Sequence, residues 1–84
     1  MEKTILHVLV GNRTGSALKV QKILTEMGCF IKTRLGIHDG SPDQCTNTGL
    51  IILELMGSDE QKHDLVSKLE KVPDVAVKLI ELRL

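Results

Sequence analysis

The spacing of the apolar residues limits the fold of this chain more than any other feature. It changes twice from the two-residue period of a strand to the longer period of a helix. Thr4–Val10 alternates as a strand, and a loop with two glycines follows it. The next apolar residues recur at helical spacing: Ala17, Val20, Ile23, Leu24 and Met27. Ser16 is expected to cap the start of this helix and Gly28 its end.

The middle of the chain contains two further runs of strand length. Cys29–Ile37 alternates, and we expect Ile31, Thr33, Leu35 and Ile37 to share one face. A polar loop over 38–48 separates this run from Gly49–Met56. The nearly continuous apolar character of 49–56 is typical of a central strand that is covered on both faces.

The last third of the chain repeats the change from helix to strand. Ser58 followed by Gln61 is a capping-box signature and predicts the start of a second helix. Its expected buried stripe consists of Leu65, Val66, Leu69 and Val72. Pro73 ends this helix, and Val75–Leu84 alternates as a final strand.

The predicted order of elements is strand, helix, strand, strand, helix, strand. Two βαβ halves in this order predict an α+β fold, the ferredoxin-like βαββαβ sandwich. The right-handed crossover rule places both helices on one face of a four-stranded antiparallel sheet. The expected spatial order is fourth, first, third and second strand. Residues 1–84 are expected to form a single domain.

The sheet face opposite the helices is predicted to be too apolar for a monomer. Its expected apolar residues are Ile5, Leu9, Phe30, Leu50, Ile52, Ala76 and Ile80. Its expected polar residues are His7, Lys32, Arg34, Glu54 and Lys78. Because a contiguous apolar patch on a small domain usually marks an interaction surface, we expect a homo-oligomer.

Composition excludes several classes of partner. Eleven basic and eleven acidic residues balance, so no general attraction to nucleic acid or to an anionic membrane is expected. Phe30 is the one aromatic residue, whereas RNA-binding sheets of this topology stack bases on aromatic side chains. No apolar run is long enough for a membrane span, no signal peptide is evident, and two cysteines are too few for a disulfide scaffold. The expected location is therefore cytoplasmic.

The loop after the first strand is the candidate ligand-binding segment. It consists of Gly11, Asn12, Arg13, Thr14, Gly15 and Ser16. Its glycines allow a tight turn and close backbone approach, and free N–H groups at the helix start would face a carboxylate or phosphate. The alternative is a tight strand-to-helix turn that binds nothing.

The same loop resembles the entry of an ACT domain, in which a polar residue, a glycine and a leucine open the first helix. Asn12, Gly15 and Leu18 match these positions, and Gly28–Ile31 resembles the family's Gly-x-x-Ile entry to the second strand. Asn12 replaces the usual acidic residue, and Thr14 the usual proline. The resemblance implies a regulatory domain that binds an amino acid or another small effector between paired domains.

A second resemblance covers nearly the whole chain. The segments that carry it are Arg34–Gly36, Gly49–Leu53, Leu65–Leu69 and Pro73–Lys78. Their order and spacing are similar to those of a small stand-alone ACT-like family of regulators of iron-only hydrogenase systems. That family is likened to the ligand domain of the nickel-responsive regulator. The resemblance implies regulation rather than catalysis, and it names no effector.

No compact metal-binding or catalytic motif is present. The possible metal ligands are His7, His38, His63, Cys29 and Cys45, and the loop also carries Asp39 and Asp43. None has the spacing of a zinc site, although two copies of His7 could meet across an oligomer contact. Arg13 and Asn47 imitate an acylphosphatase pair only loosely, because that family's phosphate cradle and second arginine are missing. We therefore expect no metal ligand and no catalytic residue.

Overall fold

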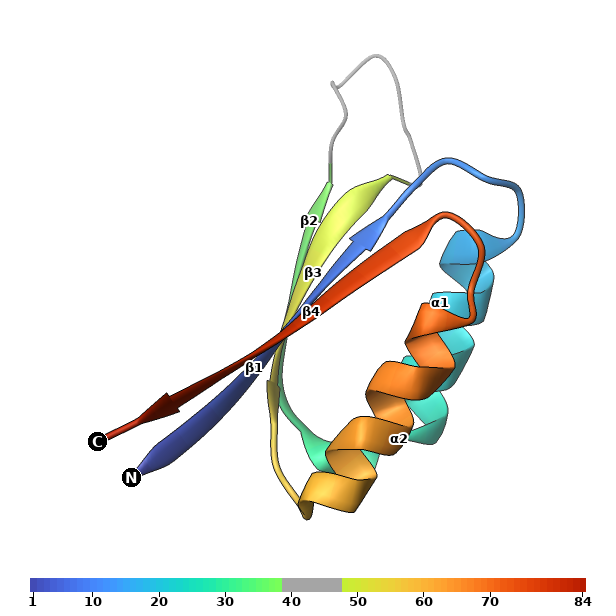
Figure 1. The fold of residues 1–84 in the computed structure, drawn as a ribbon. Coiled ribbons are helices and arrows are strands. Elements are labelled where there is room, and N and C mark those ends of the chain that lie inside the picture. The colour runs from blue at the N-terminus through green and yellow to red at the C-terminus, as the bar shows by residue number, and fades with distance from the viewer. Residues whose placement is uncertain (39–47) are drawn as a thin grey trace.

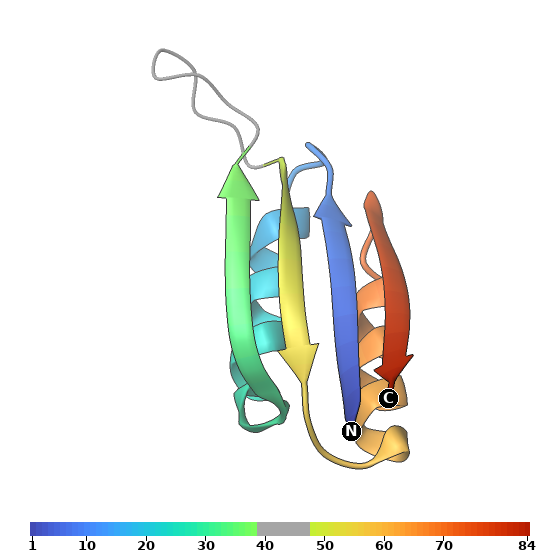
Figure 2. The same ribbon diagram turned by 90° about the vertical axis from the view of Figure 1, so that its left-hand side faces the viewer.

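The computed structural model describes residues 1–38 and 48–84 and confirms the predicted ferredoxin-like fold (Figure 1). The elements are β1 (Glu2–Val10), α1 (Ser16–Glu26), the 3₁₀ turn η1 (Gly28–Phe30), β2 (Ile31–His38), β3 (Gly49–Leu55), α2 (Asp59–Glu70) and β4 (Val75–Arg83). The sheet has the order β2-β3-β1-β4, and every neighbouring pair is antiparallel. Both helices cover one face of it, and the other face is open (Figures 1 and 2).

The core lies between the sheet and the two helices, as the alternating pattern predicts. β1 and β3 contribute every second residue: Leu6, Val8, Val10, Ile51, Leu53 and Leu55. Val20 and Leu24 of α1 pack against them together with Leu65 and Leu69 of α2. Burying each of these side chains stabilises the fold by about 1.5–3 kcal/mol, which makes this layer the main source of stability.

The two helices begin differently. Ser58 caps α2 with the predicted capping box: its hydroxyl accepts from Gln61 N at 3.2 Å, and its own N–H donates to Gln61 Oε1 at 2.8 Å. The expectation that Ser16 caps α1 is wrong. Gly15 occupies the cap position with a φ of 87°, and Ser16 is the first helical residue. The buried Ser16 hydroxyl instead donates to the carbonyl oxygen of Pro73.

The connection from α1 to β2 also differs from the prediction. Met27, not Gly28, occupies the C-cap of α1, and Gly28–Phe30 forms the 3₁₀ turn η1. The strand therefore begins at Ile31 rather than at Cys29. Phe30 packs against the core, so its predicted place on the open face is wrong.

A β-bulge between Ile31 and Thr33 decides which way β2 faces. Ile31 pairs with Leu55 but Thr33 pairs with Glu54, so β2 has one extra residue. Beyond the bulge, Arg34 pairs with the buried Leu53, and directly opposite residues share a face. Arg34 therefore faces the helix side of the sheet. Its predicted place on the open face is wrong, because a prediction from strict alternation does not allow for an extra residue in the strand.

The bulge enlarges the apolar surface of the open face. Leu35 pairs with Ile52 and Ile37 pairs with Leu50, so both lie on the open face rather than on the predicted helix side. Leu35 is 54% exposed and Ile37 45% exposed. With them, the open face carries Ile5, Leu9, Leu50, Ile52, Ala76, Ile80 and Leu82.

Neither of the two described helices has the length and hydropathy that a membrane-spanning helix requires.

Candidate functional site

The β1–α1 loop is tied to the turn that precedes β4. Gly11 N donates to the Asp74 carbonyl oxygen at 2.8 Å, and Arg13 N donates to Asp74 Oδ2 at 3.1 Å. Asp74 has a φ of 59°, in the left-handed region. A Cβ on Gly11 would overlap the Asp74 carboxylate, so a larger residue there would have to displace that side chain. Two backbone N–H groups of the loop, those of Gly11 and Arg13, thus already have an acceptor within the chain.

Three side chains of this loop remain available to a ligand. Asn12, Arg13 and Thr14 are exposed, and Arg13 forms no ion pair with residues 1–38 or 48–84. Ser16 is buried and bonded to Pro73. Binding of a ligand by Gly11–Ser16 stays a prediction, with Arg13 as its exposed cation.

A cavity of about 170 Å³ lies next to this loop, between α1 and the adjoining ends of β2 and β3. Its lining residues are Val10, Ala17, Gln21, Arg34, Gly36, Ile37, Thr48, Gly49, Leu50 and Ile51. Val10 and Ala17 directly flank the Gly11–Ser16 loop, whose own residues do not line the cavity. A volume of about 150 Å³ is enough for a molecule of the size of benzene.

Arg34 gives this cavity its chemical character. Most of the lining is aliphatic or glycine, and Gln21 adds an amide. The Arg34 guanidinium forms no ion pair within the described part of the chain. A planar guanidinium binds carboxylate or phosphate groups in a bidentate manner. The cavity can therefore hold a small molecule with an apolar body and one acidic group.

Sequence reasoning missed Arg34 and Gln21 as site residues. Gln21 lies on a helix, five positions after Ser16, and nothing in its type marks it as a ligand contact. Alternation predicts the wrong face for Arg34, because the bulge at 31–33 leaves no signature in the residue types around it.

His7, His63 and Cys29 are the possible metal ligands among the described side chains, and the structure does not bring them together. His7 lies half-buried on the open face, opposite Ile52 and Lys78, while His63 and Cys29 are exposed on other elements. Asp39, Asp43, Cys45 and Asn47 lie outside the described residues. The structure does bring the exposed carboxylates of Glu2, Asp59 and Glu81 within 4.8 Å of one another. Arg83 pairs with two of them, Glu2 at 3.5 Å and Glu81 at 3.2 Å.

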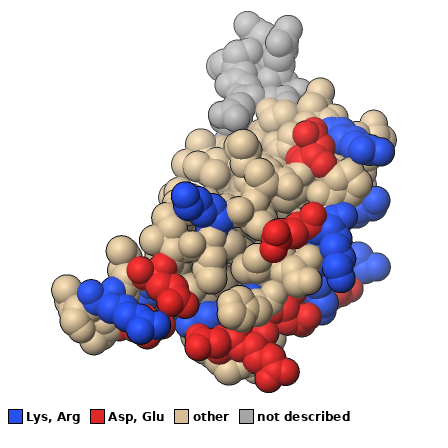
Figure 3. Space-filling view, viewed as in Figure 1, with Lys and Arg blue, Asp and Glu red and all other residues tan. Residues whose placement is uncertain are grey.

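Charges on the surface are mixed. On the face in Figure 3, acidic and basic side chains are interspersed along the helices and at the end of the molecule that carries the termini. This distribution agrees with the balanced composition of the chain.

Comparison with known proteins identifies relatives of the fold. No family model matches the chain, and no curated protein matches it. Among solved structures, an uncharacterized protein from Thermotoga maritima is similar over 99% of this chain and 100% of its own length, with 24% identity and a TM-score of 0.81. A formyltetrahydrofolate deformylase from Pseudomonas putida matches 93% of this chain with 18% identity and a TM-score of 0.56. The match spans only 28% of that enzyme.

Nitrogen regulatory PII-like proteins have the same fold. The apo form of CPII from Thiomonas intermedia matches 100% of this chain and 92% of its own length, with 12% identity and a TM-score of 0.60. The same protein bound to ADP, AMP and acetate matches 99% of this chain and 88% of its own, with a TM-score of 0.54. At these identities the likeness shows the fold, which is shared by small regulatory proteins and by part of an enzyme.

Proposed function

We propose that this protein is a regulatory domain that senses a small acidic ligand and works as a homo-oligomer. The observation that carries the proposal is the cavity of about 170 Å³ that Arg34 lines beside the β1–α1 loop. Two further facts support it. The fold is that of PII-like proteins, one of which binds ADP, AMP and acetate. The sequence also resembles ACT domains at Asn12, Gly15 and Leu18.

The proposed ligand carries one carboxylate or phosphate group on a short apolar body. Its acidic group would pair with Arg34, and its apolar part would contact aliphatic lining residues such as Ile51. The exposed Arg13 and its neighbours in Gly11–Ser16 would form the rim of the site against a neighbouring copy. The regulated process follows from the sequence resemblance alone, which points to iron-only hydrogenase systems.

Thermal unfolding with a ligand panel tests this proposal. The panel contains amino acids, acetate, AMP and ADP. A ligand at about 100 times its Kd adds about 2.7 kcal/mol, which raises the Tm of a domain of this size by about 10–20 °C. Arg34→Gln should abolish the increase, whereas Lys22→Gln, an exposed charge on α1 outside the cavity, should preserve it.

Other outcomes would change the assignment. If Arg13→Gln abolishes the increase and Arg34→Gln preserves it, the ligand binds the loop instead of the cavity. If no member of the panel changes the Tm, the alternative holds. That alternative is an interaction module without a small ligand, and the closure of the loop by Asp74 favours it. Catalysis is not part of the proposal, so an acyl phosphate should hydrolyse no faster in the presence of the protein.

A further inference from the structure

The sheet splits at the end opposite the Arg34 cavity. Pairing between β1 and β3 ends at Thr4 and Leu55, whereas β1 stays paired with β4 as far as Glu2 and Arg83. Beyond this point β3 leaves the sheet toward α2, as Figure 2 shows. The split leaves a hollow of about 330 Å³. Its lining residues are Glu2, Lys3, Thr4, Lys32, Glu54, Leu55, Met56 and Lys62.

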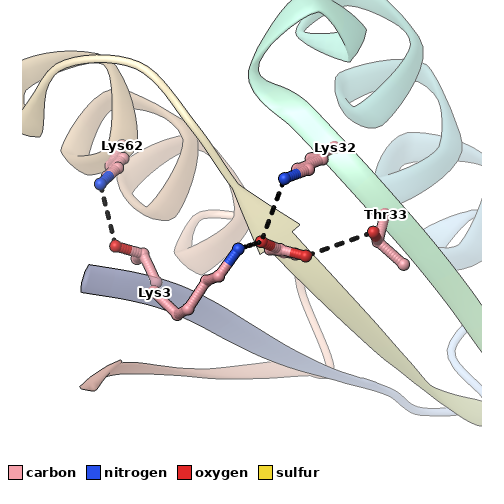
Figure 4. A network of polar contacts seen from close by, with 6 residues as sticks. Lys3, Lys32, Thr33 and Lys62 are labelled. Atoms are coloured by element: carbon pink, nitrogen blue, oxygen red, sulfur yellow. Dashed lines mark hydrogen bonds and ion pairs between the residues drawn. The ribbon is translucent and has the colours of Figure 1, made fainter. Parts of the chain in front are cut away.

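Three lysines from three different elements meet at this hollow (Figure 4). Lys3 comes from β1, Lys32 from the bulge of β2, and Lys62 from α2. The Lys3 ammonium lies 3.0 Å from Glu54 Oε2 and the Lys32 ammonium 4.0 Å from the same oxygen. One carboxylate therefore orients two of the three lysines.

Lys62 has no carboxylate partner within the described residues. Its ammonium donates to Thr4 Oγ1 at 2.9 Å, a neutral acceptor. Thr4 is 1% exposed, so the hydroxyl that anchors Lys62 is fixed within the fold. The remaining acid of the hollow, Glu2, pairs with Arg83 at 3.5 Å. Two of the three ammonium groups thus share the carboxylate of Glu54, and the lining, with three lysines and two glutamates, has a net charge of +1.

We propose that this hollow binds a phosphate group. Phosphate offers several acceptor oxygens in a tetrahedral arrangement, and ammonium groups that approach from three elements can each donate to a different oxygen. The phosphate is either inorganic or part of a small phosphate ester. Because the hollow and the Arg34 cavity share no lining residue, this site is independent of the proposed ligand-sensing site.

Titration of the protein with inorganic phosphate at constant ionic strength, followed by ¹H–¹⁵N NMR, tests the proposal. Saturable shifts are expected at the amides of Thr4, Lys32 and Lys62. Lys62→Gln should weaken phosphate binding at least about tenfold, which corresponds to about 1.4 kcal/mol, because it removes a charged donor. Glutamine removes the charge and keeps a polar side chain at this position of α2. The matched control is Lys68→Gln on the same helix, whose lysine pairs with Asp64 at 3.4 Å outside the hollow.

Two results would overturn the site. One is a set of shifts that rises linearly with phosphate, without saturation. The other is an equal loss of affinity in Lys62→Gln and Lys68→Gln, which would indicate general screening by surface lysines. Competition by AMP at the same amides would assign the site to phosphate esters, and binding of phosphate without competition would assign it to the free ion. Both of these results support the proposal.

Discussion

Glu54 is the residue on which most of the polar contacts of the open face converge. The pKa of the Glu54 carboxyl lies below its ordinary value, mainly because Lys3 donates a hydrogen bond to it. The positive charge of Lys32 lowers this pKa further. The same bond raises the pKa of Lys3. Thr33 donates to the other carboxylate oxygen at 3.4 Å.

These shifts predict a defined pH range for the stabilising effect of the pair. The contribution of Glu54 is complete above the ordinary pKa of glutamate and is lost as the pH falls through the lowered value. That of Lys3 is complete below the ordinary pKa of lysine and is lost as the pH rises through the raised value. Glu54→Gln should therefore be less stable than the parent protein at neutral pH and equally stable in acid. Urea unfolding across a pH series measures this, and a gap that persists in acid would contradict it.

A second prediction at the residue scale concerns the stability of a Gly15 variant. The Gly15 φ of 87° disfavours any L-residue, although no atom lies within 4 Å of the position that a Cβ would take. Gly15→Ala should thus cost about 1 kcal/mol through backbone strain alone and lower the Tm by about 4–8 °C. Gly28→Ala is the control, because Gly28 has equal space and no positive φ. Equal Tm changes in the two variants would be evidence against this explanation.

At the scale of elements, the two helices differ in the contacts that hold their first turns in place. α2 carries its own cap in Ser58 and Gln61, with Asp59 and Glu60 in its first turn. α1 has no side-chain cap and no acidic residue in its first turn. Its start is held from outside, through the contacts of the loop and of Ser16 with Pro73 and Asp74. The start of α1 therefore depends on the tertiary fold, whereas that of α2 does not.

This difference predicts a local role for the Ser58 cap. Ser58→Ala should lower the free energy of unfolding by about 1 kcal/mol, because it removes the acceptor for the Gln61 amide. Ser67→Ala, at an exposed position within α2, should be neutral or slightly stabilising. Chemical denaturation of both variants provides the measurement, and a neutral Ser58→Ala would show that the cap contributes little.

At the scale of the whole molecule, the open face of the sheet has no covering layer. Its exposed apolar residues include Leu9, Leu35 and Ile80, which lie on β1, β2 and β4 and are each at least 36% exposed. Exposed apolar patches on small domains usually serve in association. We therefore expect the homo-oligomer of the proposed function to pair through this face.

Light scattering coupled to size exclusion tests the prediction. Leu35→Lys should reduce the measured mass to that of the monomer, because pairing through the open face would then bury a charge. Leu18→Lys is the matched control, since Leu18 is 77% exposed on α1 and away from the open face. A monomeric parent protein, or a mass that Leu35→Lys leaves unchanged, would rule out pairing through this face.

The period of the apolar residues was sufficient to predict the fold. Leu6 and Val8 of β1 alternate without interruption, and Leu65 and Leu69 of α2 keep helical spacing, so their buried faces follow from local geometry. The capping box at Ser58 is equally local, because its two partners are three residues apart. Such patterns depend only on residues within one element, so they can be recognised without knowing which segments pack against it.

Tertiary structure decided which residues of β2 lie on each face of the sheet and which residues line the candidate sites. Alternation predicts the open face for Arg34, and only the bulge against Leu55 and Glu54 places it on the helix side. The acceptor for Arg13 N belongs to Asp74, 61 residues further along the chain, and Lys62 reaches Thr4 across 58 residues. The sequence alone determined the elements and their order because these depend on neighbouring residues. The cavity and the hollow depend on register and on contacts between distant segments, which exist only once the sheet and helices have packed.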